Sequence, residues 1–263
     1  MKRRAQRKKF ARDRLHICRC DKGLPFYVLD ILESKKGIDW ESVSSECGRY
    51  ASRVIAPRDV ILPDENGLKR FVPVSMNSLL IFNTAAEIIR KASLPPDSFS
   101  ISLTDRNALH PSRVCELLPL ASCVRVITAY PERYAAACAH ALEEFGATLI
   151  IRPAYEETSK PDIVICSDGA VTAAMRNSAV FAFRRKTGGR IIFSGSETEL
   201  LQKHTEILPE NIDSVDFAGA VTELCGCSEY KKSVFSQIEI SCQKCEKKTA
   251  EKCLECFVKS INT

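Results

Sequence analysis

The chain has 263 residues, of which 45% are apolar and 27% charged, a composition that builds a packed core under a charged surface and excludes a disordered chain. The N-terminus lacks the apolar region of a secretory signal, and no stretch approaches the roughly 18 apolar residues of a membrane-spanning helix. Thirteen cysteines without such a signal are typical of a soluble cytoplasmic protein with reduced or metal-bound thiols. Their odd number argues against a complete disulfide framework.

The net charge of +5 is concentrated at the N-terminus, where residues 1–15 hold eight Lys/Arg and one acid, Asp13. The rest of the chain is close to neutral, so the positive charge belongs to a basic arm that we expect to be mobile. Such an arm predicts salt-dependent binding to nucleic acid, with a solvated tail as the alternative. Its single aromatic residue, Phe10, gives little support for base stacking.

Residues 16–95 are expected to form a small α+β region. Apolar residues predict a strand over 24–33, and Asp39 is placed to cap a helix from Trp40 to about Val54. The apolar spacing over residues 75–93 predicts a second helix, which Pro95 and Pro96 would end. We therefore place a domain junction at residues 94–97.

Short apolar runs separated by helical segments follow, a pattern typical of parallel strands buried on both faces. The sequence predicts strands over 98–103, 123–128, 148–152 and 162–166, and helices over 104–122, 131–147 and 213–224. Two more apolar runs, 179–185 and 190–195, flank a Lys-Thr-Gly-Gly sequence that favours a hairpin turn.

The predicted fold class is α/β, with a Rossmann-like, doubly wound, mostly parallel sheet. The expected parts are a basic arm over 1–15, the α+β region over 16–95, the Rossmann-like domain over 96–230 and a Cys-rich tail over 231–263.

Ligands of open α/β sheets bind at the carboxyl ends of the strands, which makes the residues there candidates for a binding site. They are Thr104, Asp105, Arg106, Asn107, Thr128, Asp168 and Gly169. Asp105 and Asp168 are expected to face one crevice, or alternatively to cap turns. Helices beginning near Pro111 and Pro131 would add amides for an anion. His110 is interpreted either as an acid–base partner of Asp105 or as a solvated histidine.

The order of elements over residues 99–195, together with RVITAYPERY (125–134) and PDIVICSDG (161–169), resembles the Rossmann-like NAD(P)-binding domains of the shikimate dehydrogenase and glutamyl-tRNA reductase type. The resemblance implies a nicotinamide cofactor, NAD(P), in the strand-end crevice. The Gly-rich turn of such domains is replaced by Asp105, Arg106 and Asn107, and Thr128 stands where an acid would hold a ribose.

The tail contains two C-x2-C pairs, Cys242 with Cys245 and Cys253 with Cys256, a spacing that suits tetrahedral zinc. In the alternative, Cys253 is a core residue, because an apolar stripe with helical spacing runs through Ala250, Cys253, Leu254, Phe257, Val258 and Ile261. Cys225 with Cys227, and Cys18 with Cys20, are further candidate ligands.

Three functions remain open from the sequence. The first is a cytoplasmic nucleotide-fold protein that binds a small ligand or a protein partner. The second is an NAD(P)-dependent oxidoreductase. The third is a zinc-stabilised protein that associates with nucleic acid through its basic arm. None of the three involves a membrane.

Overall fold

The computed structural model describes residues 14–19, 25–31, 37–154, 162–167, 175–184, 189–225, 229–242 and 248–263. The chain forms two compact units, one from Met1–Pro73 with Leu200–Ser228 and the other from Val74–Glu199 with Glu229–Thr263. The junction expected at residues 94–97 lies inside the second unit. Among the described residues, no helix has the length and apolar character needed to cross a membrane.

The first unit begins with an antiparallel hairpin of β1 (Arg14–Arg19) and β2 (Pro25–Asp30). Asp39 caps helix α2 (Trp40–Cys47) by accepting a hydrogen bond from the Ser42 amide, as the sequence predicted. The remaining elements are the 3₁₀ helices η1 (Gly48–Arg53) and η2 (Asp64–Asn66) and the helices α5 (Gln202–Thr205) and α6 (Ser214–Cys225).

Contacts between distant parts of the sequence hold this unit together. Phe26 of β2 packs against Phe217 of α6, with ring centroids 5.6 Å apart. The Arg58 guanidinium lies 2.6 Å from the Asp213 carboxylate, at the start of the same helix. These contacts explain why residues 200–228 belong to the first unit although they follow the sheet strands in sequence.

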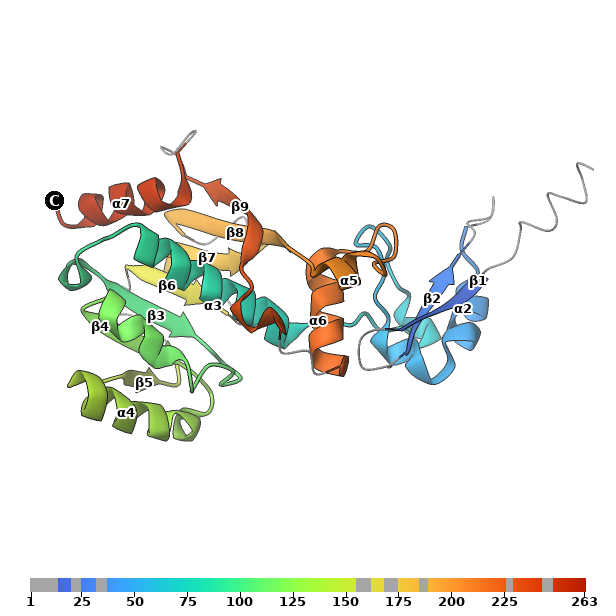
Figure 1. Ribbon diagram of the computed structural model, residues 1–263, viewed down its shortest axis with the longest axis horizontal. Coiled ribbons are helices and arrows are strands. Elements are labelled where there is room, and N and C mark those ends of the chain that lie inside the picture. The colour runs from blue at the N-terminus through green and yellow to red at the C-terminus, as the bar shows by residue number, and fades with distance from the viewer. Residues whose placement is uncertain are drawn as a thin grey trace, which may run out of the picture. The chain divides into compact units, whose positions relative to one another are not determined.

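The second unit contains a seven-stranded sheet (Figure 1). Its strands are β3 (Ser100–Thr104), β4 (Cys123–Ile127), β5 (Ile150–Arg152), β6 (Ile163–Cys166), β7 (Ala179–Phe183), β8 (Ile191–Thr198) and β9 (Phe235–Ser241). Their order across the sheet is β5-β4-β3-β6-β7-β8-β9, and only β9 runs antiparallel to its neighbour. The predicted α/β fold with a mostly parallel sheet is therefore confirmed.

The strand order has a direct consequence for binding. The chain moves outward from β3 to β4 and β5 and then returns to β6 on the other side of β3. This is the usual order of dinucleotide-binding sheets, with an added antiparallel edge strand. The order reverses between β3 and β6, so the carboxyl ends of these two strands mark the place where such sheets bind ligands.

The hairpin expected around Lys-Thr-Gly-Gly is wrong, because β7 and β8 pair in parallel with Ala179 beside Ile191. Both strands are largely buried, and parallel pairing suits strands buried on both faces. The antiparallel partner of β8 is instead β9, a strand within the expected tail that the sequence analysis did not predict.

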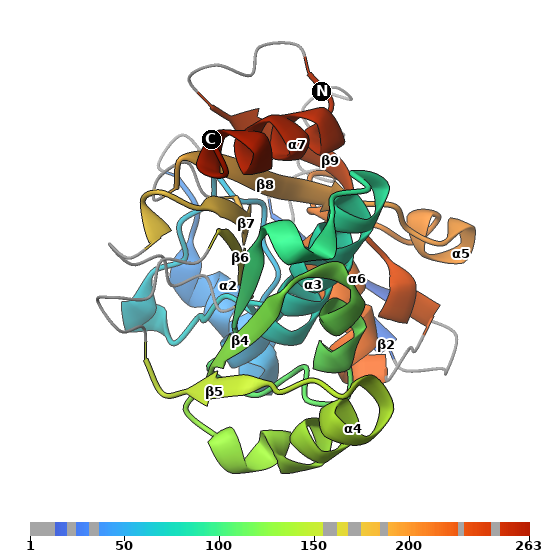
Figure 2. The same ribbon diagram turned by 90° about the vertical axis from the view of Figure 1, so that its left-hand side faces the viewer.

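Helices α3 (Val74–Lys91), α4 (Ala135–Phe145) and α7 (Ala250–Ile261) belong to the same unit, with short 3₁₀ helices η3 (Pro96–Ser98), η4 (Val114–Leu120), η5 (Pro131–Tyr134) and η7 (Glu229–Lys232). Helix α3 contacts α7, η4 and the strands β6 and β7, and α4 contacts η4. These helices therefore follow one another in the order α7, α3, η4 and α4 (Figure 2). The helix expected over 104–122 is wrong, because the connection there is the 3₁₀ helix η4 with Pro119 inside it.

Candidate functional site

At the switch point, hydrogen bonds join the ends of β3 and β6 to each other. Thr104 pairs with Cys166, and the backbone carbonyl of Thr104 accepts bonds from the amide and the hydroxyl of Ser167. Thr104 is itself 2% exposed. Asp168 and Gly169, which were expected to complete the crevice, lie outside the described residues, so the expected pairing of Asp105 with Asp168 stays a prediction.

Asp105, the first residue after β3, is 1% exposed, and its carboxylate is fully engaged inside the turn. One oxygen accepts the Leu109 amide at 2.9 Å. The other accepts the His110 amide at 2.7 Å and the Tyr134 hydroxyl at 2.5 Å. These bonds match the alternative in which Asp105 caps a turn.

The turn after β3 therefore differs chemically from a Gly-rich phosphate loop. In such a loop the backbone amides face a pyrophosphate, whereas here the amides of Leu109 and His110 donate to Asp105. Ala108 adopts a left-handed conformation, with φ of 50°, at a place where glycine would be favoured. The Asp105 carboxylate thus accepts hydrogen bonds from amides that would otherwise be available to a bound phosphate.

Tyr134, in η5 before α4, is buried and was not identified from the sequence. Burial and its hydrogen bond to Asp105 raise the pKa of the Tyr134 hydroxyl, which stays protonated and keeps donating. A tyrosine in a predicted helix gives no sequence signal for such a contact, because its partner is 29 residues away in the chain.

His110 is 2% exposed, so the expected solvated position is wrong. Its ring stacks on Phe82 of α3 with centroids 4.8 Å apart, and its Nε2 lies 2.6 Å from the Ser78 hydroxyl. The contact with Asp105 uses the His110 backbone amide rather than the ring. Burial lowers the pKa of His110, and the nearby Asp105 carboxylate opposes this shift only in part.

The buried histidine predicts a pH-dependent stability. Below about pH 6.5 the unfolded chain binds a proton at His110, whereas in the folded protein burial disfavours this proton. Protonation therefore favours the unfolded chain, and the free energy of unfolding falls as the pH drops below this value. We expect the free energy of unfolding to fall by up to about 1 kcal/mol more between pH 7 and pH 5.5 in the native chain than in a His110→Gln variant. Urea unfolding at the two pH values measures this difference, and equal changes in both proteins would contradict it.

Thr128, at the end of β4, is fully buried and positions the next loop. Its hydroxyl accepts the Tyr130 amide at 3.2 Å, and its amide donates to the Arg152 carbonyl at 3.0 Å. This side chain is therefore engaged within the protein.

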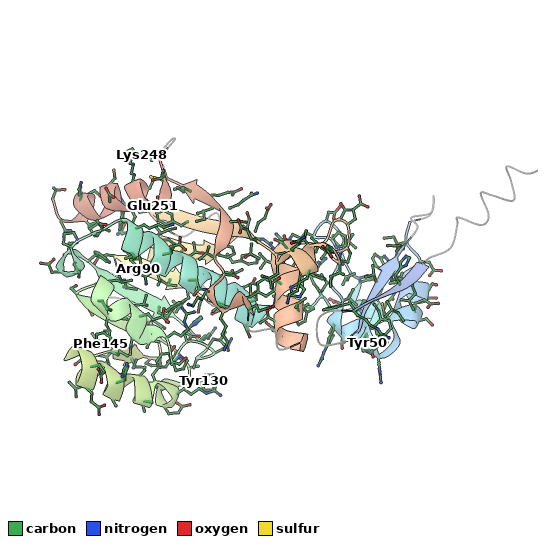
Figure 3. All side chains as sticks on the ribbon, viewed as in Figure 1. Tyr50, Arg90, Tyr130, Phe145, Lys248 and Glu251 are labelled. Carbon is green, nitrogen blue, oxygen red and sulfur yellow. The ribbon has the colours of Figure 1, made fainter. Side chains whose placement is uncertain are left out.

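Exposed groups at the same edge come from two loops that touch one another. The Ala129 amide donates to the Arg106 carbonyl at 3.2 Å, and Arg133 Nη1 donates to the Asn107 carbonyl at 3.4 Å. The Arg133 guanidinium also lies 4.8 Å from the centroid of the Tyr130 ring, which is 42% exposed. Figure 3 shows Tyr130 at the N-terminal end of α4, with Phe145 at the other end.

We name the exposed side chains of Arg106, Asn107, Tyr130 and Arg133 the strand-end surface. In the part of the chain that the structure describes, neither Arg106 nor Arg133 forms an ion pair with a carboxylate. Of these four residues, Arg106 and Asn107 are among the candidates named from the sequence. No α-helix begins near Pro111, so the anion site expected there is wrong, whereas the turn at Pro131 leads into α4.

Two of the four candidate zinc ligands, Cys253 and Cys256, lie in α7. Cys253 is fully buried on the apolar stripe of the helix, and Cys256 is exposed, with its Sγ 3.4 Å from the Lys248 ammonium. Cys242 follows β9, and Cys245 lies outside the described residues. The described residues contain no group of three or more His, Cys, Asp or Glu placed to hold a metal.

The zinc site stays a prediction, which elemental analysis would test. Cys18, Cys20, Cys225 and Cys227 cannot be placed in it, because their side chains lie outside what the structure describes.

Neither a protein-family model nor a curated protein matches the chain. Among solved structures, L-tryptophan dehydrogenase from Nostoc punctiforme is similar over 90% of this chain and 67% of that chain, with 18% sequence identity and a TM-score of 0.31. A similarity this low does not carry an activity from one protein to the other.

Proposed function

We propose that this protein binds an anionic small ligand that carries phosphate, and that the strand-end surface holds it. Two arginines reach this surface from the ends of neighbouring strands, Arg106 after β3 and Arg133 after β4. The observation that carries the proposal is that both are exposed and without a carboxylate partner among the described residues, beside an exposed tyrosine ring. No catalytic step is part of this proposal.

The chemistry of these side chains favours phosphate over other anions. A guanidinium presents a planar set of donors that matches two oxygens of a phosphate, and it stays charged at any physiological pH. The contacts between the two loops bring the Arg106 and Arg133 residues to the same edge of the sheet before a ligand arrives. The Tyr130 ring offers an aromatic face for a base or another flat group.

The residues of the turn after β3 do not fit the pyrophosphate of NAD(P) in its usual position. The Leu109 and His110 amides donate to Asp105, and the Tyr134 hydroxyl completes the set of donors on that carboxylate. A pyrophosphate there would displace a buried carboxylate from its partners and be repelled by its charge. Hydride transfer is therefore not part of the proposed function.

Calorimetric titration with inorganic phosphate, AMP, ATP and NADP⁺ tests the proposal on the full chain. We expect Arg106→Gln and Arg133→Gln each to weaken phosphate-dependent binding about tenfold, because each removes a charged hydrogen bond. Arg90→Gln is the matched control, since Arg90 is an exposed arginine on α3 of the same unit (Figure 3).

Three results would overturn the proposal. One is the absence of binding for all four compounds at millimolar concentration. Another is an equal loss of binding in the Arg90→Gln control, which would mean that the protein attracts anions through its general charge rather than at the strand-end surface. Unchanged binding in Arg106→Gln and Arg133→Gln would likewise remove these residues from the site.

A further inference from the structure

We propose that the protein forms a symmetric dimer in which helix α4 packs against α4 of a second copy, at the β5 edge of the sheet. This contact lies within the second unit and does not depend on the function proposed above. Three features support it: an exposed apolar stripe on α4, an open strand edge beside the helix, and charges at the helix ends that oppose its dipole.

Helix α4 carries apolar side chains on its exposed side as well as on its buried side. The buried positions are Ala137 and Ala141, one turn apart. The exposed stripe has the spacing i, i+3, i+4, i+7 and i+10, and it consists of Ala135, Cys138, Ala139, Leu142 and Phe145. Leu142 is 64% exposed and Phe145 45%. A helix that is apolar on both sides calls for a cover on both sides, because water disfavours the outer stripe.

Helix α7 of the same unit provides the contrast. It buries its apolar stripe, and its exposed residues include Lys252, Lys259 and Ser260. This is the usual amphipathic pattern, from which the outer stripe of α4 departs. Exposed apolar groups gathered on one element indicate an interaction surface.

Strand β5 leaves an edge of the sheet open beside α4. It is the first strand in the sheet order and, within the described sheet, pairs only with β4. Figures 1 and 2 both show α4 beside β5 at this end of the sheet. A strand edge presents backbone donors and acceptors to a further strand. Because β5 has only 3 residues, the helix supplies most of the contact.

A two-fold axis perpendicular to the sheet, next to β5, covers both features at once. It sets β5 antiparallel to β5 of the second copy, as a continued sheet requires. Because α4 lies beside β5, the same axis brings the two α4 helices together antiparallel, and one stripe serves both copies. The small side chains of Ala135 and Ala139 permit a close approach, and Leu142 and Phe145 fill the space between the helices.

The charges at the ends of α4 favour a second copy as the partner. Glu143 and Glu144 lie in the last turn, at the negative end of the helix dipole, and neither forms an ion pair with a residue that the structure describes. At the positive end, Arg133 precedes α4 and Arg152 ends the neighbouring β5, with Glu132 offsetting one of these charges. Antiparallel pairing places the acidic end of each copy beside the basic end of the other, where charges and dipoles attract.

The size of this surface sets the expected affinity. Helix α4 has 11 residues and is therefore about 16 Å long. Even with β5, the contact is smaller than the roughly 800 Å² per partner of a standard interface. We therefore expect a reversible dimer with a Kd on the order of 10 µM.

Sedimentation equilibrium of the full chain tests the dimer, at concentrations from about tenfold below to tenfold above the expected Kd. The weight-average mass should rise from 29.3 kDa towards twice this value. Leu142→Gln should weaken the dimer about tenfold, because it removes a large apolar side chain from the stripe and keeps a good helix former. Ile61→Gln is the matched control, since Ile61 is an apolar residue of the first unit that is 85% exposed.

The double change Glu143→Lys with Glu144→Lys tests the charges. At low salt it should weaken the dimer about fivefold, because both ends of α4 are then basic and repel their counterparts. Added salt should weaken the native dimer and strengthen the doubly changed one, since it screens attraction and repulsion alike. Glu206→Lys with Glu210→Lys is the control, an equal change of net charge on exposed glutamates of the first unit. Arg133 stays unchanged because it also belongs to the strand-end surface.

A mass of 29.3 kDa at every concentration would refute the dimer. An undiminished dimer in Leu142→Gln, or an equal loss in the Ile61→Gln control, would remove α4 from the contact. A dimer that Ile17→Ser disrupts and Leu142→Gln leaves intact would place the contact on the β1–β2 hairpin and contradict the assignment. Circular dichroism of each variant checks the fold, which a change at the exposed Leu142 should leave intact.

Discussion

Replacing Gly195 with alanine is expected to lower the free energy of unfolding by about 2–3 kcal/mol, as overpacking in a core does. Gly195 lies in β8 between β7 and β9, beside a shift in register. A Cβ atom at this position would overlap the ring of Phe235, with several ring atoms far inside contact distance. That ring is held in place by stacking on Phe183, with centroids 5.8 Å apart, so it has little freedom to move.

Urea unfolding of four proteins measures this effect: the native chain, Gly195→Ala, Phe235→Ala and the double variant. If the overlap with Phe235 is the cause, Gly195→Ala should cost about 2–3 kcal/mol with Phe235 present and less than about 1 kcal/mol in the Phe235→Ala background. Equal costs in the two backgrounds would place the effect in the backbone of β8 and contradict this explanation.

Replacing Asp105 with alanine is expected to cost about 3–4 kcal/mol, because three donors lose their acceptor at once. The Leu109 and His110 amides and the Tyr134 hydroxyl all point at this carboxylate. The side chain is 1% exposed, so water cannot readily replace it. The same change opens the turn after β3 and frees its amides.

Tyr134→Phe serves as the comparison for Asp105→Ala. It removes one of the three bonds and leaves both amides paired, so we expect a loss of about 1–2 kcal/mol. The difference between the two variants in the free energy of unfolding, measured with urea, gives the contribution of the two amide hydrogen bonds to stability. A loss in Asp105→Ala no larger than that in Tyr134→Phe would show that the carboxylate does not organise the turn.

The two predictions concern different kinds of position. Gly195 is required by the close approach of an aromatic ring, and Asp105 is required by the donors that its carboxylate accepts inside the turn. Neither requirement depends on a ligand. Binding at the strand-end surface should therefore be measured in variants of the exposed Arg106 and Arg133, which can be changed without disturbing the core.

Several of the local elements could be read from the sequence. Asp39 caps α2, the apolar spacing of Leu80, Thr84 and Ile88 forms α3, and the run at residues 162–166 forms the buried β6. Each depends on residues within one or two turns of one another, so side-chain spacing and capping chemistry suffice to predict it. The parallel α/β class followed from the same information, because short runs buried on both faces leave few other arrangements.

The tertiary structure alone decided which elements meet. Glycine-rich sequence before β8 suggested a hairpin, but β8 pairs in parallel with β7 and antiparallel with β9. In the second pairing Ile192 lies opposite Ser241, 49 residues further along the chain. The Asp105–Tyr134 bond and the Tyr27–Tyr50 stack likewise join residues that are distant in sequence. Pairing energies of this kind depend on three-dimensional approach, which local periodicity does not contain. The strand-end surface also depends on contacts between distant loops, and for that reason the sequence predicted the fold better than the site.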